Sequence, residues 1–376
     1  MKVMLGLSGG VDSAVSAYLL KEQGYDVICC FMRNWDSMAN NDVLGNPTLN
    51  DNICPQEKDY NDACLVAKKL GLKMMRIDFI KEYWDNVFSY FLDEYKKGRT
   101  PNPDIFCNKY IKFDAFLNFA HKNGCEMIAM GHYAKRVVIG DKAYLYKAKD
   151  LSKDQSYFLS QINQKQLMSC LFPLGDISKK EVREIAHKIG LESVMDKKDS
   201  TGVCFIGERN FKEFLENYLP AQKGKIVDID TNRVLGTHDG VLYYTLGQRR
   251  GLGIGGIHGE DAKGWFVCKK DVKKNILYVA SGSEDEHLFS DSAIINNLNF
   301  FNEKPLEGEH LNVKFRYRQQ DLGVTIHYDN DSAIRLVFDD NYKAVTPGQG
   351  CVFYKKDLCL GGGIIDQVFY KGVLKN

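Results

Sequence analysis

The sequence predicts an α/β protein in three parts: a parallel-sheet domain, a small mostly β central domain and a C-terminal β-barrel. Up to about residue 131, short apolar runs alternate with segments of helical periodicity, which is typical of a parallel sheet covered by helices. Beyond about residue 220, short β-like runs separated by Gly, Asp and Asn replace the helices. We expect domain boundaries at 1–208, 209–280 and 281–376.

The composition sets limits on the class of protein. A chain of 376 residues is long enough for about two or three domains with their own cores. Its 50 Lys and Arg nearly balance its 49 Asp and Glu, so overall charge neither favours nor excludes a nucleic-acid partner. No apolar run reaches the ~18 residues of a membrane span, and the first residues read as a strand and not as a signal peptide.

The 11 cysteines are distributed without C-x-x-C pairs. This pattern predicts reduced thiols in the cytoplasm, without a disulfide framework and without a zinc site of the usual spacing. We therefore expect no metal held by these cysteines.

A glycine-rich turn, residues 8–13, organises the N-terminal part. It follows an apolar strand at 2–7 and precedes a helix that begins near Ala14 and is closed by Gly24. The start of a helix offers unbonded N–H groups and the positive end of a dipole, and glycine lets an anion approach the backbone. The turn therefore predicts a phosphate site; a turn that binds nothing is the alternative.

The type of phosphate site follows from Asp12. A Walker loop has lysine at this place, and the glycines do not form G-x-G-x-x-G. A carboxylate beside phosphate needs a cation between them, so Asp12 predicts bound Mg²⁺. The motif S-G-G-x-D-S resembles the pyrophosphate loop of the ATP pyrophosphatase family, which implies ATP, cleaved to AMP and pyrophosphate while a substrate oxygen is adenylated.

Further elements follow in chain order. In the first domain we expect strands over 26–32, 73–79 and 126–130, helices over 60–70, 83–97 and 110–122, and a long loop over 36–58. Ligands of parallel sheets bind at the carboxyl ends of the strands. The loops after Leu7, Met32 and Met130 should therefore share one pocket.

The second half begins with a helix opened by the capping box of Ser178 and Glu181, followed by a helix near 211–219. We expect strands of the central domain over 225–229, 241–245, 265–269 and 276–279. For the barrel we expect strands over 311–318, 324–328, 333–338 and 351–355.

Two cysteines lie in polar surroundings. We expect Cys107 in a proline-pinned loop just before a helix, with Lys109 close enough to favour a lowered thiol pKa. Cys204 lies in a polar turn, downstream of Lys197 and Lys198. Each is either a nucleophile or an inert buried thiol; a nucleophile is needed to displace an adenylated oxygen, and sulfur would serve. Cysteines within strand-like runs are typical core residues: Cys29, Cys30 and Cys125.

Several spaced motifs together resemble the tRNA-specific 2-thiouridylase family over nearly the whole chain. They are G-x-S-G-G-V-D-S at 6–13, N-P-D-x-x-C-N-x-x-I-K-F at 102–113, G-H-Y-A at 131–134, K-D-Q-S-Y-F at 153–158, S-T-G-x-C-F-I-G at 200–207, T-L-G-Q-R-R-G-L at 245–252 and T-P-G-Q at 346–349. Only the segment 36–58 shows no pattern that can be matched.

The resemblance implies an adenine-nucleotide domain of the pyrophosphate-loop type and a role for each matched position. Met32 would line the adenine site, and Gly131 would touch the nucleotide. The residues that would hold ATP are Gly6, Leu7, Ser8, Gly9, Gly10, Val11, Asp12 and Ser13.

The family chemistry assigns sulfur transfer to the two cysteines. Cys204 would carry a persulfide received from a sulfur-relay donor protein, Cys107 would be the nucleophile that completes transfer, and the two would form a transient disulfide. Asp104 is a candidate acid or base. The residues that would face the target uridine are Asn102, Pro103 and Asp104, and those that would contact tRNA are His132, Lys153, Asp154, Gln155, Arg316, Tyr317 and Gln349.

These implied RNA contacts have structural alternatives. Strict alternation in a strand over 311–318 would give it one basic face, and would place Tyr317 opposite Arg316 unless the strand ends or bulges there. His132 is equally a structural histidine, and Lys153–Gln155 equally a helix N-cap with Asp154 as the cap. Arg249 and Arg250 form a second basic loop suited to phosphates.

The sequence thus predicts a monomeric, ATP-dependent enzyme that thiolates the wobble uridine in the anticodon of specific tRNAs. Two alternatives stay open. One is a pyrophosphate-loop ligase that adenylates a small metabolite; the other is an ATP-gated RNA-binding module without catalysis.

Overall fold

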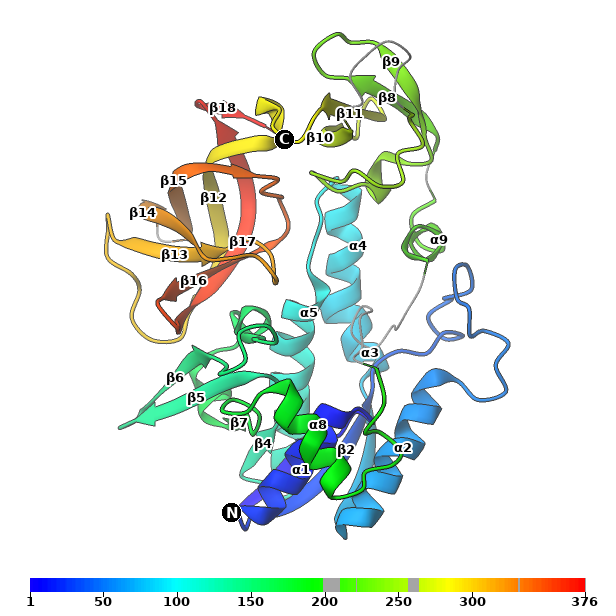
Figure 1. The fold of residues 1–376 in the computed structure, drawn as a ribbon, viewed down its shortest axis with the longest axis vertical. Coiled ribbons are helices and arrows are strands. Elements are labelled where there is room, and N and C mark those ends of the chain that lie inside the picture. The colour runs from blue at the N-terminus through cyan, green and yellow to red at the C-terminus, as the bar shows by residue number, and fades with distance from the viewer. Residues whose placement is uncertain (199–209, 221, 256–263, 331, 376) are drawn as a thin grey trace.

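A computed structural model describes residues 1–198, 210–220, 222–255, 264–330 and 332–375. Figure 1 shows three parts: an N-terminal domain at the bottom, a barrel at the upper left and a central domain at the upper right. Helix α4 (Ser89–Lys96) rises from the N-terminal domain between the other two. The predicted architecture of parallel sheet, small β domain and barrel is confirmed.

A five-stranded parallel sheet forms the centre of the N-terminal domain, in the order β3-β2-β1-β4-β7. Its strands are β1 (Lys2–Gly6), β2 (Asp26–Arg33), β3 (Lys73–Asp78), β4 (Met127–Ala129) and β7 (Cys170–Leu171). Side chains alternate between two cores, so that Val3 packs on one face and Met4 on the other. As predicted, helices cover both faces.

The helices on the first face are α1 (Val11–Glu22), α2 (Pro55–Leu70) and α8 (Lys179–Lys188). Gly71 ends α2 in the left-handed conformation, φ +66°, and Ser178 and Glu181 form the predicted capping box of α8. Proline suits the first turn of a helix, so α2 begins at Pro55 and takes the last residues of the predicted loop. Its N-terminal half points toward the turn after β1.

The opposite face is covered by two long helical segments with π-helical sections. The first contains α3 (Ile80–Tyr83), η1 (Trp84–Phe88) and α4; the second contains α5 (Pro103–Phe106), η2 (Cys107–Ala115) and α6 (Phe116–Lys122). The expected loop around Cys107 is wrong, because this second segment begins already at Pro103. The Asn102 side chain accepts a hydrogen bond from Asp104 N (3.1 Å), and Pro103 fits the first helical position.

The barrel contains six strands in the order β12-β15-β14-β13-β16-β17, and β12 pairs again with β17 to close it. They are β12 (Phe289–Phe300), β13 (His310–Lys314), β14 (Leu322–Asn330), β15 (Ala333–Lys343), β16 (Gly350–Lys355) and β17 (Leu358–Tyr370), with β18 (Val373–Leu374) beside β17. A hairpin of the N-terminal domain, β5 (Ala134–Ile139) and β6 (Lys142–Lys147), joins the same sheet through β17.

The central domain has a four-stranded sheet in the order β10-β11-β8-β9. Its strands are β8 (Gly224–Asp228), β9 (Val234–His238), β10 (Trp265–Asp271) and β11 (Ile276–Ser281). The predicted strand at 241–245 is wrong: this stretch begins with a 3-10 turn, η4 (Val241–Tyr243), and the strand lies earlier, at β9. Val241 and Tyr244 are buried in the domain core, which explains the apolar run.

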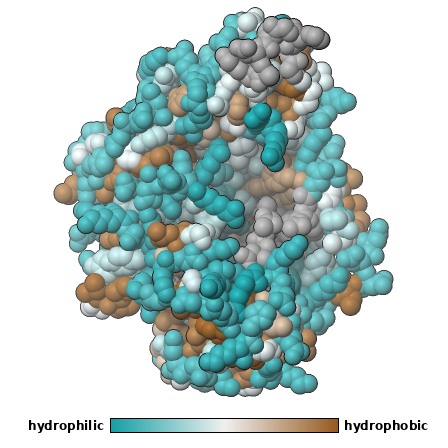
Figure 2. Space-filling view, viewed as in Figure 1, coloured by the Kyte–Doolittle hydropathy of each residue, from teal (hydrophilic) through white to brown (hydrophobic). Residues whose placement is uncertain are grey.

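Four short helices complete the described structure: α7 (Gln164–Met168), α9 (Phe211–Glu216), η3 (Ser156–Leu159) and η5 (Glu286–Leu288). No helix in the described ranges has the length and apolar character needed to cross a membrane. The face in Figure 2 is largely hydrophilic, with hydrophobic residues in scattered patches.

Candidate active site

The turn after β1 has the geometry of an anion site. Ser13 Oγ accepts a hydrogen bond from Ser8 N (3.1 Å) and donates to Gly10 O (3.1 Å), which fixes the turn from within. Ala14 N bonds to Gly10 O as the first backbone bond of α1. By helix geometry, the N–H groups of residues 11–13 precede that bond and are directed toward a ligand at the helix end. The predicted strand, turn and helix are confirmed.

Glycines bring neighbouring segments against this turn. Gly9 has φ +74°, and a Cβ there would stand 2.2 Å from Asp59 O of α2. A Cβ at Gly131, after β4, would stand 3.0 Å from Ser13 N. A Cβ at Gly6 would stand 2.9 Å from Met130 Sδ and 3.0 Å from Met32 Cε. The segments after β1, β2 and β4 therefore meet at the turn, as the parallel sheet predicts.

Asp12 is held by two residues that sequence reasoning did not assign to the site. Its carboxylate accepts bonds from Lys179 Nζ (2.7 and 2.8 Å) and from Tyr133 OH (2.7 Å). Lys179 is the first residue of α8, 167 positions away, and in the sequence it is simply part of a capping box. Lys179 lies buried beside Asp12, so the carboxylate at the turn is paired with an ammonium group.

Lys197 supplies a second cation. Its Nζ donates to Gly9 O (3.0 Å), Asp62 Oδ2 (2.9 Å) and Asp59 Oδ1 (2.5 Å). Burial alone would lower the pKa of Lys197, but its bonds to Asp59 and Asp62 raise it. The ammonium therefore stays charged where it touches the turn.

Cys107 is fully buried at the first residue of η2. Asn108 Nδ2 donates to Asp104 O (3.0 Å) and to Phe158 O (3.1 Å), which ties this helix to η3. Lys109, expected to activate the thiol, has its Nζ bonded to Gln161 Oε1 (3.1 Å). Cys204 lies outside the described residues, so its approach to Cys107 stays a prediction.

The predicted RNA contacts fall into two groups. In the first, Tyr317 OH donates to Lys153 O (3.4 Å). Asp154 is buried and accepts bonds from Ala148 N, Ser156 N and Ser156 Oγ. The N-cap residue of η3 is Gln155, so the alternative of Asp154 as a helix cap is wrong. Burial raises the pKa of Asp154. Gln155 exchanges hydrogen bonds with the backbone of Tyr133, the residue that holds Asp12.

The second group lies at the barrel. Strand β13 ends at Lys314, so the strand expected to Arg318 is wrong, and Arg316 and Tyr317 lie in the turn that follows. Arg316 Nη2 donates to Leu246 O, Ala344 O and Thr346 Oγ1. Gln349 Nε2 donates to Thr100 O (2.7 Å). These residues are thus bonded within the protein here.

The expected basic strand face is therefore also wrong. Lys314 is largely buried: its Nζ lies near Asp321 (3.8 Å) and over the ring of Tyr354. Arg318 lies beyond the strand, with its guanidinium 6.0 Å from the ring centroid of Tyr317.

His132 is buried, with its ring beside those of Phe113 and Phe172. Its Nδ1 has no hydrogen-bond partner in the part of the chain that the structure describes. Burial, with a smaller effect of Lys112, lowers its pKa well below 6.5. The position suits the structural alternative; contact with RNA stays a prediction.

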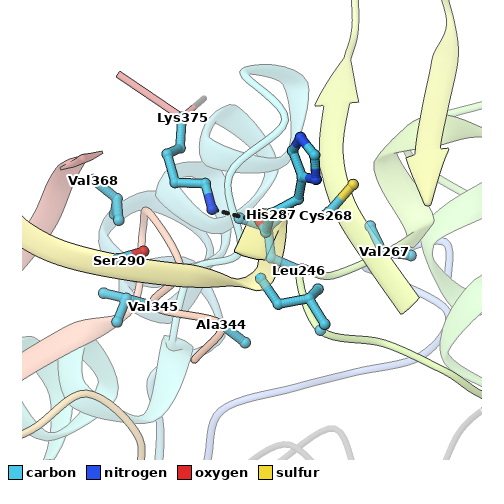
Figure 3. Close-up of a pocket in the computed structure, with 11 residues that line it drawn as sticks. Leu246, Val267, Cys268, His287, Ser290, Ala344, Val345, Val368 and Lys375 are labelled. Atoms are coloured by element: carbon cyan, nitrogen blue, oxygen red, sulfur yellow. Dashed lines mark hydrogen bonds between the residues drawn. The ribbon is translucent and has the colours of Figure 1, made fainter. Parts of the chain in front are cut away.

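One group of three potential metal ligands occurs among the described residues, away from the phosphate turn. Asp230, Asp285 and His287 have ligand atoms within 4.8 Å of one another, with Asp230 exposed. A pocket beside His287 lies between the central domain and the barrel (Figure 3). Its lining comes from residues 246–247, 267–268, 287–288, 290, 344–345, 368 and 375, none of which belongs to the turn of residues 8–13.

Comparisons with known proteins match the whole length of the chain. A family model described as tRNA methyl transferase HUP domain matches residues 1–208, a tRNA methyl transferase PRC-barrel domain 212–281, and an aminomethyltransferase beta-barrel domain 290–365. A solved 4-thiouridine synthetase–RNA complex with bound ATP has 16% identity over 55% of this chain and 46% of that chain, with a TM-score of 0.31.

Curated relatives are much closer. The tRNA-specific 2-thiouridylase MnmA of Mycoplasma capricolum is 55% identical over 375 residues, covering 98% of this chain and 99% of the relative. That of Listeria monocytogenes is 52% identical over 374 residues, covering 99% and 96%. The chain therefore belongs to the tRNA-specific 2-thiouridylase family.

Proposed function

We propose that this chain is an ATP-dependent sulfurtransferase that replaces the 2-oxygen of the wobble uridine in tRNA with sulfur. The observation that carries the proposal is the turn of residues 8–13, which combines an open helix start with Asp12, Lys179 and Lys197. The family-model descriptions name methyl transfer, but an anion site of this kind suits a nucleoside triphosphate, and the relatives matched over their full length are named 2-thiouridylase.

ATP would supply the adenylyl group that activates the uridine oxygen. Its phosphates would rest on Gly6–Ser13, with the adenine near Met32 and the nucleotide touching Gly131. Asp12 suits Mg²⁺, since carboxylate oxygens are preferred ligands and its side chain keeps 33% exposure at the turn. Lys179 would exchange Asp12 for phosphate oxygens and balance part of the remaining phosphate charge, while Lys197 would hold the turn through Gly9 O.

Sulfur would arrive as a persulfide on Cys204, passed on by a donor protein. The terminal sulfur attacks C2 of the adenylated uridine, and AMP leaves. The Cys107 thiolate then attacks the Cys204 sulfur, which forms a disulfide and releases the thiolated uridine. Two equivalents of an external thiol, or one dithiol, then reduce the disulfide and are themselves oxidised to a disulfide. Asp104, whose backbone N–H bonds to the Asn102 cap, would move a proton at the uridine. Since Cys107 is buried, this step needs a rearrangement on RNA binding.

The parts of the chain would divide these tasks. Residues 1–208 bind nucleotide and carry out the chemistry, 209–280 form the central domain, and 281–376 form an RNA-binding barrel. Lys153, Asp154, Gln155, Arg316, Tyr317, Gln349 and His132 would contact tRNA. The enzyme would act as a monomer in the cytoplasm.

The test is to incubate the protein with ATP, Mg²⁺, tRNA and a persulfide donor, then to measure AMP and the tRNA nucleosides by mass spectrometry. We expect AMP and 2-thiouridine together. Cys107→Ser and Cys204→Ser should each abolish 2-thiouridine, while Cys125→Ser should leave it largely intact. AMP formed without tRNA would favour a small-metabolite ligase, and tRNA binding without AMP would favour a non-catalytic module.

A further inference from the structure

We propose that the barrel loop Thr346–Gln349 is part of the active-site scaffold, and that Gln349 is a positioning residue for the segment that carries Asp104 and Cys107. The inference rests on the proposed function for its catalytic meaning. It differs from the expected role of Gln349 as an RNA contact, because it assigns the side chain a task within the protein.

Both backbone polar groups of Thr100 form hydrogen bonds with this loop. Thr100 N donates to Pro347 O (2.9 Å), and Gln349 Nε2 donates to Thr100 O (2.7 Å). Thr100 is buried, so water does not readily replace these bonds. The loop itself is held by strand β17, since Gly348 N donates to Ile365 O and Ile365 N to Gln349 O.

Close packing accompanies these bonds. Gly348 has φ +92°, and a Cβ there would stand 3.0 Å from the N and C atoms of Thr100. A Cβ at Gly350 would stand 2.5 Å from Ile105 Cδ1 of α5. The barrel therefore rests without side-chain spacers on both sides of the Asn102–Asp104 segment.

Arg99, the residue before Thr100, also connects this segment to the barrel. Its Nη1 pairs with Asp366 Oδ1 (2.6 Å), its Nη2 donates to Ile365 O (2.9 Å), and its Nε pairs with Glu94 Oε2 (2.7 Å). Asp366 and Ile365 belong to β17, and Glu94 belongs to α4. Arg99 thus joins the barrel to the helix that precedes the active-site segment.

A displacement of Thr100 passes directly to the catalytic groups. Pro101 and Pro103 restrict the backbone between Thr100 and α5, and the Asn102 side chain caps that helix. Asp104 lies in the first turn of α5, and Cys107 follows in the same helical segment. Few backbone dihedrals can absorb a shift, so the barrel loop sets the position of both residues.

Arg316, in the barrel turn after β13, connects the loop to the central domain. It bonds to Thr346 Oγ1, the first residue of the loop, and bridges Leu246 O and Ala344 O across the seam that holds the pocket of Figure 3. An RNA group that forms hydrogen bonds with Arg316 or Gln349 would therefore replace bonds that hold the loop and Thr100 in place.

The experiment compares Gln349→Met with wild type, because methionine keeps the length and loses the donor. We expect faster hydrogen exchange of backbone amides in residues 99–106 without RNA, by about 10-fold. The rate of AMP formation at saturating tRNA should fall about 10-fold to 100-fold. Asp366→Asn, which weakens Arg99 and is not an expected RNA contact, should show the same two changes. Gln367→Met, exposed on the same strand, is the matched control and should show neither.

The proposal is overturned if Gln349→Met changes only tRNA affinity and keeps the wild-type hydrogen exchange at 99–106 and the wild-type AMP rate at saturating tRNA. It is also overturned if Asp366→Asn changes neither the exchange nor the AMP rate. Thermal unfolding of each variant identifies global destabilisation, and in that case the exchange of 99–106 is compared with that of β1. The exchange measurement needs no activity. If wild type forms no AMP, the proposed function fails, while the positioning role is still decided by exchange.

Discussion

At the scale of single residues, the negative charge of Asp12 at the turn is compensated by Lys179. A carboxylate at the mouth of an anion site repels phosphate, and here Lys179 and Tyr133 hold it. The arrangement suits a group that exchanges partners when nucleotide and metal arrive. Burial of Lys179 makes the pair costly to break without replacement.

Asp12→Asn should lower the rate of AMP formation by at least about 100-fold, because the amide is a poor Mg²⁺ ligand and leaves Lys179 without a counter-charge. The free energy of unfolding should fall by about 1–3 kcal/mol, since a charged hydrogen bond is weakened. AMP release and denaturant unfolding are the measurements. Asp141→Asn, at the exposed turn between β5 and β6, serves as control. A variant with the parental AMP rate would remove Asp12 from the mechanism.

His132 predicts a pH dependence of stability. In the unfolded chain histidine titrates near pH 6.5, whereas burial lowers the pKa of His132 in the folded protein. Between the two pKa values the unfolded state binds more protons. The free energy of unfolding should therefore fall as the pH drops below about 6.5, by up to ~1.4 kcal/mol per pH unit for this group.

His132→Phe should reduce this slope, measured by denaturant unfolding between pH 5 and 7. His238, whose pKa burial also lowers, leaves a residual slope. The control His121→Phe, exposed at the end of α6, should keep the wild-type slope. Equal slopes for wild type and His132→Phe would mean that His132 does not stay neutral in the fold.

At the scale of elements, the start of α1 is shaped by the segments that touch it. Gly131 follows β4 and lies against the backbone of Ser13. The turn of residues 8–13 and the segment after β4 thus meet at two strand ends, and the glycine leaves the space between them. Glycine is needed at position 131 because a Cβ would come too close to Ser13; its backbone is not in the left-handed region, so conformation does not require it.

Gly131→Ala should weaken ATP binding about 10-fold or more, because the new Cβ, 3.0 Å from Ser13 N, pushes the turn aside. Calorimetry with a non-hydrolysable ATP analogue measures the effect. Gly255→Ala, where a Cβ meets open space, is the control. Unchanged affinity in Gly131→Ala would show that the turn can move to accommodate the Cβ without weakening ATP binding.

At the scale of the whole molecule, the three parts are joined by bonds between distant positions. Thr100 meets Gln349, and Arg316 meets Leu246. The hairpin of β5 and β6 extends the barrel sheet from the N-terminal domain. An RNA that spans these parts therefore contacts surfaces whose relative placement is already set.

Binding of tRNA should weaken steeply with salt, and Arg250→Ala should reduce the log–log slope by about one. Arg250 is exposed, and no side-chain bond of its guanidinium is seen within the described ranges. Arg316→Ala is a less direct test, because it also removes three hydrogen bonds within the protein. Lys122→Ala, exposed at the end of α6, is the control. An unchanged slope and affinity for Arg250→Ala would exclude this residue from the interface.

Two barrel strands, β12 and β17, could not be predicted from local sequence patterns. Residues 296–299 and 361–363 resemble loops in composition, yet they lie in β12 and β17, the two longest strands of the barrel. A Cβ at Gly361 would stand 2.0 Å from Asn299 O, so these strands approach too closely for a side chain. Glycine is needed here because of a partner strand that is distant in the sequence, so the residues around Gly361 do not reveal the strand.

Features that depend on neighbours along the chain could be predicted from the sequence: the turn after β1, the capping box of Ser178, the end of α2 at Gly71, and the alternation of strands and helices. Contacts between distant positions became visible only in the folded molecule: the pairing of Asp12 with Lys179, the bonds of Lys197 at Gly9, the closure of the barrel and the support of Thr100 by Gln349. These contacts join positions from about 60 to about 250 residues apart, so no local period, cap or turn records them; they follow from how the packed elements meet.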